Sequence, residues 1–93
     1  MPRAHIALIE DDPVFQSVVR QYLEKNGYDV CCADNGIEGI EICRTQCPDI
    51  VLCDLKLPDI DGLEVIEQLL KVCTHIPIIV ISASEKMSDI REA

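Results

Sequence analysis

Short apolar runs alternate with longer segments of helical periodicity along the whole chain. The apolar runs predict strands near residues 4–9, 28–33, 49–53 and 77–81. The third and fourth runs, IVLC and IPIIVI, are continuously apolar and rich in β-branched residues. Such runs are typical of strands that are covered on both faces.

The segments between these runs predict three helices. Apolar residues recur there at helical spacing. Pro13 suits the first turn of the first helix and Gly27 its stop. We expect Asn35 to cap the second helix and Asp61 to cap the third, because short polar side chains satisfy the free amides of a first turn.

A strand and helix alternation with short connections predicts an α/β fold, with a doubly wound parallel sheet and helices on both faces. Functional sites in such sheets lie beyond the carboxyl ends of the strands. Asp11 and Asp12 follow the first strand and Asp54 follows the third, whereas Asp29 and Asp49 enter strands from the opposite edge. Only the first three can build a common site.

Three carboxylates at one sheet edge repel one another, so a cation must neutralise them or one of them must stay protonated. Oxygen ligands of this kind favour magnesium. An aspartate beside such an ion is also a nucleophile for a phosphoryl group, with which it forms an acyl phosphate. The pattern therefore predicts Mg²⁺-dependent phosphoryl chemistry.

Composition and charge narrow the setting. The chain has 93 residues, of which 48% are apolar, which predicts one domain over residues 1–93. Its net charge of -9 opposes direct binding to nucleic acid or to an anionic membrane. Glu10 comes too early for a secretory signal and IPIIVIS is too short to cross a bilayer, so we expect a cytoplasmic protein.

The cysteines predict neither a disulfide framework nor a zinc site. No CxxC motif occurs, and most of the cysteines stand at apolar periodic positions, which favours buried free thiols. Cys43 and Cys47 would share a helix face, but no second ligand pair has suitable spacing, and neither His5 nor His75 is an evident partner. The six residues are Cys31, Cys32, Cys43, Cys47, Cys53 and Cys73.

Three motifs stand in order along the chain: LIEDDP after the first strand, VLCDLKLPDIDG across the third and VISAS at the end of the fourth. Together they resemble the receiver domain of response regulators in two-component signalling, and the resemblance covers the whole chain. It implies a flavodoxin-like fold with strand order 2-1-3-4, the fifth strand being absent.

The resemblance also implies roles for residues at the carboxyl edge. Asp54 resembles the aspartate that accepts the phosphoryl group. Asp11 and Asp12 look like the acidic pair that holds Mg²⁺, and Lys56 would add its backbone carbonyl. Ser82 matches the hydroxyl residue that contacts the phosphoryl group.

Three further positions match the receiver pattern. Ala83 matches the small residue that leaves the phosphoryl group room. Pro58 and Gly62 would shape the loop after Asp54. Duller interpretations exist for single residues, since Asp12 could simply cap the first helix and Ser82 could be an ordinary residue at a strand end.

The resemblance implies partners as well. The phosphoryl donor would be a phosphohistidine on a sensor histidine kinase or a phosphotransfer protein, and the readout would be changed contacts with an output domain or an effector protein. The chain ends at Ala93, inside the fourth helix that SEKMSDIREA predicts. We therefore expect a fragment of a longer protein, without the fifth strand and helix, that self-associates through the exposed edge of its fourth strand.

Two other functions compete with a phosphorylated switch, which would not be a free-standing turnover enzyme. One is an adaptor of the same fold that signals without phosphorylation. The other is a phosphatase of the haloacid dehalogenase type, which also forms an aspartyl phosphate with Mg²⁺. That family needs DxD after its first strand, whereas this chain has EDDP there.

Overall fold

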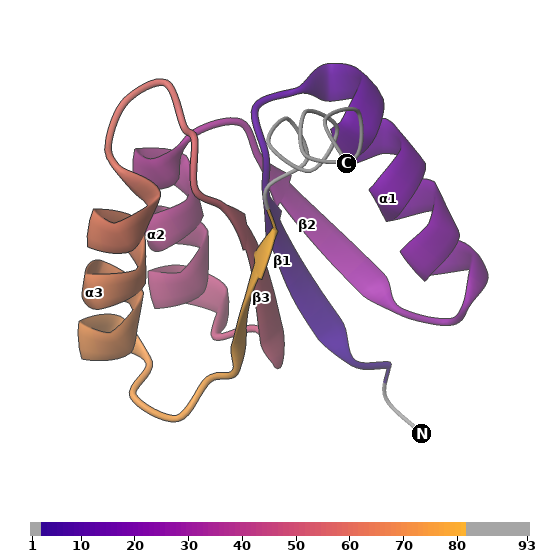
Figure 1. The fold of residues 1–93 in the computed structure, drawn as a ribbon. Helices are drawn as coiled ribbons and strands as arrows, with labels where there is room; N and C mark the ends of the chain where they lie inside the picture. Colours follow the sequence, from indigo (N-terminus) through magenta and orange to yellow (C-terminus); the bar gives the residue numbers. More distant parts are fainter. Residues whose placement is uncertain (1–2, 82–93) are drawn as a thin grey trace, which may run out of the picture.

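The computed structural model describes residues 3–81, which form four strands and three helices in strict alternation (Figure 1). The strands and helices confirm the predicted order, and the ends of the strands differ from the predicted ones by at most one residue. The elements are β1 (His5–Ile9), α1 (Pro13–Lys25), β2 (Asp29–Ala33), α2 (Gly36–Gln46), β3 (Ile50–Asp54), α3 (Gly62–Val72) and β4 (Ile78–Ile81).

All strand pairs are parallel, and the sheet order is β2-β1-β3-β4, as the receiver resemblance implied. In the central pair Ile9 at the end of β1 lies opposite Cys53 in β3. Because the two strands run in the same direction, the residues that follow Ile9 and Cys53 emerge side by side. The register thus brings two distant acidic segments together.

Helices α2 and α3 lie on one side of the sheet and α1 on the other (Figure 1). The core fills the space between the sheet and the α2–α3 pair. It contains the fully buried side chains of Ile9, Val51, Cys53, Val65 and Leu69. Burial of these residues from both layers fixes the sheet against the two helices.

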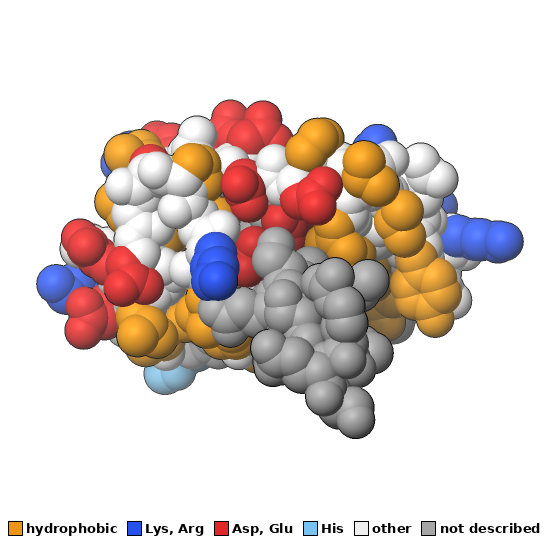
Figure 2. All heavy atoms as spheres, turned by 45° about the horizontal axis from the view of Figure 1, so that its top comes forward, with side chains coloured by type: hydrophobic (Ala, Val, Ile, Leu, Met, Phe, Trp, Pro, Cys, Tyr) orange, Lys and Arg blue, Asp and Glu red, His pale blue; other side chains and the backbone are white. Residues whose placement is uncertain are grey.

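Helix α1 is less buried than its apolar periodicity predicts. Among the described residues it has no buried side chain. Val14, Val18 and Tyr22 form an exposed stripe, with exposed fractions of 72%, 61% and 67% (Figure 2). Apolar residues lie on more than one face of α1, so periodicity alone did not identify the face that meets the sheet.

The three helices begin at side-chain caps. Asn35 accepts a hydrogen bond from the Glu38 amide at 2.8 Å, and Asp61 accepts one from the Leu63 amide at 3.1 Å. Both caps were predicted. Asp12 caps α1, which bears directly on the functional site.

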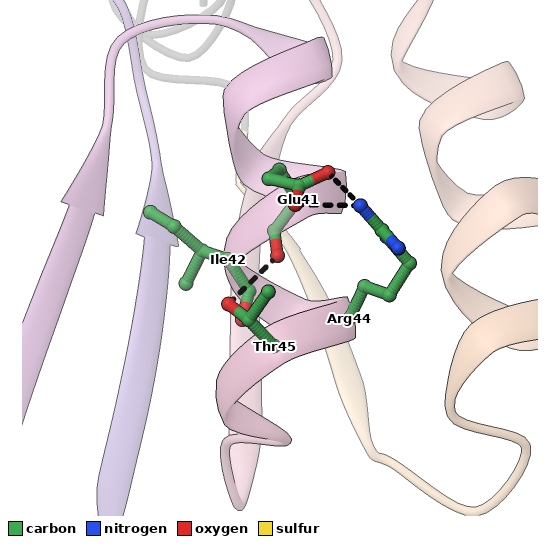
Figure 3. Close-up of polar contacts among 4 residues, drawn as sticks. All are labelled: Glu41, Ile42, Arg44 and Thr45. Atoms are coloured by element: carbon green, nitrogen blue, oxygen red, sulfur yellow. Dashed lines mark hydrogen bonds and ion pairs between the residues drawn. The ribbon is translucent and has the colours of Figure 1, made fainter.

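The solvent face of α2 carries local polar contacts (Figure 3). Arg44 donates from Nη2 to both carboxylate oxygens of Glu41, at 2.5 and 2.6 Å. The Thr45 hydroxyl donates to the Glu41 carbonyl at 3.0 Å. An exposed pair three residues apart stabilises a helix by only about 0.2–0.5 kcal/mol, so these contacts support α2 without determining its position.

Several predictions concern the chain beyond β4. Ser82, Ala83 and the predicted fourth helix lie outside the described residues. Within residues 3–81, β4 is hydrogen-bonded to β3 alone, and self-association through its other edge stays a prediction. In this part of the chain no helix has the length and apolar character needed to span a bilayer.

Gly62, the first residue of α3, packs against the backbone of the loop that follows Asp54. Its amide donates to the Leu55 carbonyl at 3.1 Å. A Cβ atom at this position would overlap the Leu55 Cα atom and lie 2.7 Å from the Leu55 carbonyl oxygen. Backbone atoms cannot move aside as the end of a side chain can, so only glycine fits here.

We therefore predict that Gly62→Ala lowers the free energy of unfolding by about 2–3 kcal/mol, measured by urea denaturation. Leu63→Ala is the matched control, because Leu63 is the next residue and is 62% exposed. Its effect should stay within about 0.5 kcal/mol. Equal stabilities of the two variants would contradict the close packing at Gly62.

Candidate functional site

Three acidic side chains meet at the carboxyl edge of the sheet. Glu10 and Asp11 follow β1, and Asp54 is the last residue of β3. One carboxylate oxygen from each lies within 4.8 Å of the others. Figure 2 turns this edge forward and shows acidic side chains gathered at its centre. The parallel register of β1 and β3 creates this group.

Glu10 is the buried member that follows β1. Its side chain is only 1% exposed, and Oε2 accepts a hydrogen bond from the Asp12 amide at 3.0 Å. Burial raises the pKa of Glu10 to about 7, and the nearby charges of Asp54 and Asp11 act in the same direction. Its other oxygen, Oε1, is buried without a hydrogen-bond partner among the described residues.

Asp54 is also buried, with an exposed fraction of 4%. Its Oδ1 atom accepts a hydrogen bond from the Lys56 amide at 3.2 Å. This contact turns the carboxylate toward the loop that follows β3. Asp11, by contrast, is exposed at the mouth of the group, where a ligand from solvent can reach it.

Asp11 and Asp12 were predicted to hold Mg²⁺ as a pair, but the Asp12 side chain has other partners. Its Oδ1 atom accepts hydrogen bonds from the amides of Val14 and Phe15, at 3.0 and 3.3 Å, and so caps α1. It is not part of the group that Glu10, Asp11 and Asp54 form. The structure therefore shows this side chain as a helix cap, in agreement with the duller interpretation of Asp12.

Glu10 was not predicted to join this group, although the chain contains a signal for it. Pro13 favours the first position of a helix, which makes Asp12 the N-cap and leaves its side chain occupied. The acidic pair beside Asp54 must then come from the two residues before Asp12. The position of Pro13 therefore indicates Glu10 and Asp11.

The loop after Asp54 is tied to α2 by a residue that sequence analysis did not single out. The two carboxylate oxygens of Asp59 accept hydrogen bonds from the amides of Gly36 and Ile37, both at 2.8 Å. These amides belong to the first turn of α2, where backbone donors lack helical partners. Asp59 thus holds the loop against a rigid element.

Gln16 braces the other loop of the site. Its Nε2 atom donates to the Glu10 carbonyl at 2.8 Å and to the Asp34 carboxylate at 3.0 Å. The loop after β1 is thereby joined to α1 and to the loop after β2.

Lys56 is exposed, and the predicted metal contact of its backbone carbonyl stays a prediction.

The chemistry of the three carboxylates fits a divalent cation. All side-chain donors are oxygens, which favour Mg²⁺ over softer metals. The unpartnered Oε1 of Glu10 is costly to bury unless a cation or proton meets it. Within residues 3–81 no other group of three or more His, Cys, Asp or Glu side chains has metal-binding spacing. Two surface hollows, beside His5 and beside His75, lie at the opposite edge of the sheet.

Known proteins are similar to this chain in sequence and in fold. The family profile for the response regulator receiver domain matches residues 6–93. The Regulator of RpoS of Escherichia coli is 32% identical over 88 residues, which are 95% of this chain and 26% of that protein. The chain thus spans about a quarter of the length of this curated relative.

Two solved structures are similar over most of the chain. A response regulator receiver domain protein from Methanospirillum hungatei has a TM-score of 0.85 and 28% identity, over 87% of this chain and 65% of that one. The receiver domain of a sensor histidine kinase from Pseudomonas aeruginosa has a TM-score of 0.83 and 31% identity, over 88% and 69%. That structure has a magnesium ion coordinated in the active site cleft.

The profile match covers nearly the whole chain, and the observed strand order is the one that the receiver resemblance implied. The fold agrees with that of solved receiver domains. This chain belongs to the response regulator receiver domain family.

Proposed function

We propose that this chain is a phospho-accepting receiver domain in which Asp54 takes a phosphoryl group from a phosphohistidine, with Mg²⁺ as the cofactor. One observation carries the proposal: carboxylate oxygens of Glu10, Asp11 and Asp54 lie within 4.8 Å of one another, and Asp54 is buried. The family membership and the magnesium ion in the related receiver domain support it.

The reaction needs little more than positioning and compensation of charge. A carboxylate oxygen of Asp54 bonds to phosphorus while the bond from phosphorus to the histidine nitrogen breaks, which leaves an acyl phosphate on Asp54 and a free imidazole. When bound, Mg²⁺ offsets negative charge on the transferred group. Water that later attacks phosphorus releases phosphate and resets Asp54.

The residues around Asp54 divide this work. Glu10 and Asp11 would hold the metal, and the Lys56 carbonyl would complete the protein ligands. The hydrogen bond from the Lys56 amide orients the Asp54 carboxylate before the reaction. Ser82 would contact the phosphoryl group, and Ala83 would leave it room.

The phosphoryl donor in this proposal is a sensor histidine kinase or a phosphotransfer protein in the cytoplasm. The signal is a change of contacts with an output domain or an effector protein. The Regulator of RpoS is named as a regulator, and this chain corresponds to 26% of its length. The proposed role is therefore that of a switch that accepts a phosphoryl group on itself, without turnover of a separate substrate.

We predict that incubation with acetyl phosphate and Mg²⁺ adds the mass of one phosphoryl group to the chain, measured by intact mass spectrometry. Asp54→Asn should abolish the addition, because an amide is not a nucleophile for phosphorus. Asp12→Asn is the matched control, since asparagine also caps helices. Equal incorporation by the Asp54→Asn variant would contradict the assignment.

We predict that Glu10→Gln and Asp11→Asn each weaken Mg²⁺ binding at least about tenfold, measured by isothermal titration, because each removes an anionic ligand or neighbour of the ion. Asp12→Asn should change the dissociation constant by less than about threefold, since Asp12 faces the amides of α1. A tenfold loss of affinity in Asp12→Asn, with little change in Glu10→Gln, would instead support the pair of Asp11 and Asp12.

The raised pKa of Glu10 predicts how metal-free stability depends on pH. The folded protein favours the protonated Glu10 carboxyl. The stabilisation that this protonated carboxyl gives to the folded state is complete below pH 4.5 and is lost as the pH rises through about 7. At pH 7.5 in a chelator, Glu10→Gln should raise the free energy of unfolding by about 1–3 kcal/mol.

Urea denaturation at pH 4.5 and pH 7.5 measures this difference. The two proteins should have nearly equal stability at the lower pH, and saturating Mg²⁺ at the higher pH should favour the wild type. A Glu10→Gln variant that is less stable than the wild type at pH 7.5 without metal would show that the ionised carboxylate is well accommodated.

A further inference from the structure

Two cysteines from distant parts of the chain meet at the edge of the sheet opposite the acidic group. Cys47 ends α2 and Cys73 ends α3. Their Sγ atoms are 3.5 Å apart, and the Cys73 thiol also lies 3.5 Å from the Cys43 carbonyl oxygen. The sequence suggested that Cys43 and Cys47 share a helix face, whereas in the structure the Cys47 thiol lies beside that of Cys73.

The backbones of both cysteines are held in place. The Cys47 amide donates to the Cys43 carbonyl at 3.0 Å, and the Cys73 amide donates to the Leu69 carbonyl at 2.8 Å. Each residue is thus the C-cap of a helix that packs against the core. The two thiols stay neighbours as long as α2 and α3 remain packed together.

The pair is accessible from solvent. Cys47 is exposed, and both cysteines line an open hollow of about 460 Å³ together with Asp49, His75 and Pro77. Small oxidants can therefore reach Cys47. Burial raises the pKa of the Cys73 thiol, and its hydrogen bond to Cys47 acts in the same direction. Cys47 is the thiol that an oxidant meets first.

We propose that Cys47 and Cys73 form a reversible intramolecular disulfide when a hydroperoxide oxidises the protein. A disulfide has an S–S length of about 2.05 Å, so the two sulfur atoms must approach by about 1.5 Å. In the proposed reaction, rotation of the two side chains at the helix ends supplies this approach. The proposal is independent of phosphorylation at Asp54.

The chemistry balances in two steps. The Cys47 thiolate attacks the outer oxygen of the hydroperoxide, the O–O bond breaks, and an alcohol leaves with the thiol proton, which gives a sulfenic acid on Cys47. The Cys73 sulfur then attacks the Cys47 sulfur, the S–O bond breaks, and water leaves. Two thiols and one hydroperoxide become one disulfide, one alcohol and one water; with hydrogen peroxide as the oxidant, the products are one disulfide and two waters.

The cross-link would join the far ends of α2 and α3 and enclose the chain between them. That segment contains β3, Asp54 and the loop to α3. A covalent link across it restricts the unfolded chain and so favours the folded state. Oxidation should therefore raise Tm by about 10 °C, and dithiothreitol should reverse the change.

The test treats the full chain with a small excess of hydrogen peroxide, blocks remaining thiols with a maleimide, and counts the labels by mass. We expect four labels instead of six, because two of the six cysteines are consumed. Cys47→Ser and Cys73→Ser should each prevent the loss of two labels and the rise of Tm. Cys31→Ser is the control. The Cys31 thiol donates to Gln46 and is not part of the Cys47–Cys73 contact, so this substitution should leave the disulfide intact.

Peptide mapping without reduction then locates the link, with thermal unfolding of each reduced variant as the check on folding. A bond between Cys47 and Cys73 confirms the proposal. A bond between other cysteines, a disulfide between two chains, or oxidation that stops at sulfinic acid on Cys47 would overturn it.

Discussion

The convergence of three carboxylates at the carboxyl edge of a parallel sheet is the constraint on which the site depends. The register that places Ile9 opposite Cys53 carries Glu10 and Asp11 to the side of Asp54. Hydrophobic burial of β1 and β3 maintains this register against the repulsion of like charges. A bound cation would offset this repulsion, so the arrangement of the three carboxylates favours metal binding.

The loops around the group are fixed by contacts that leave its carboxylates available. Asp12 satisfies the amides of α1, and Asp59 satisfies those of α2. Gly62 lets α3 begin directly against the loop after Asp54. Each acidic segment therefore combines capping residues, which orient the backbone, with residues that face the site. This division explains why neighbouring aspartates have different functions.

The sequence predicted the strands, the N-terminal caps of α2 and α3 and the sheet edge at which acidic residues gather, because these follow from periodicity, caps and the geometry of parallel sheets. It did not predict which of the acids after β1 faces Asp54, since that depends on the turn that leads into α1. The contact of Asp59 with α2 joins residues more than twenty positions apart and leaves no local pattern. The pairing of Cys47 with Cys73 depends likewise on how α2 and α3 pack.

We propose that Glu10, Asp11 and Asp54, and not Asp12, surround the bound cation. A crystal structure of the chain with Mn²⁺ in place of Mg²⁺ tests this most directly, because anomalous scattering locates the ion. We expect a single strong peak beside the oxygens of Asp11 and Asp54, with Glu10 facing it and Asp12 still on the amides of α1. A peak bound to the Asp12 carboxylate, or none at this edge of the sheet, would contradict the claim.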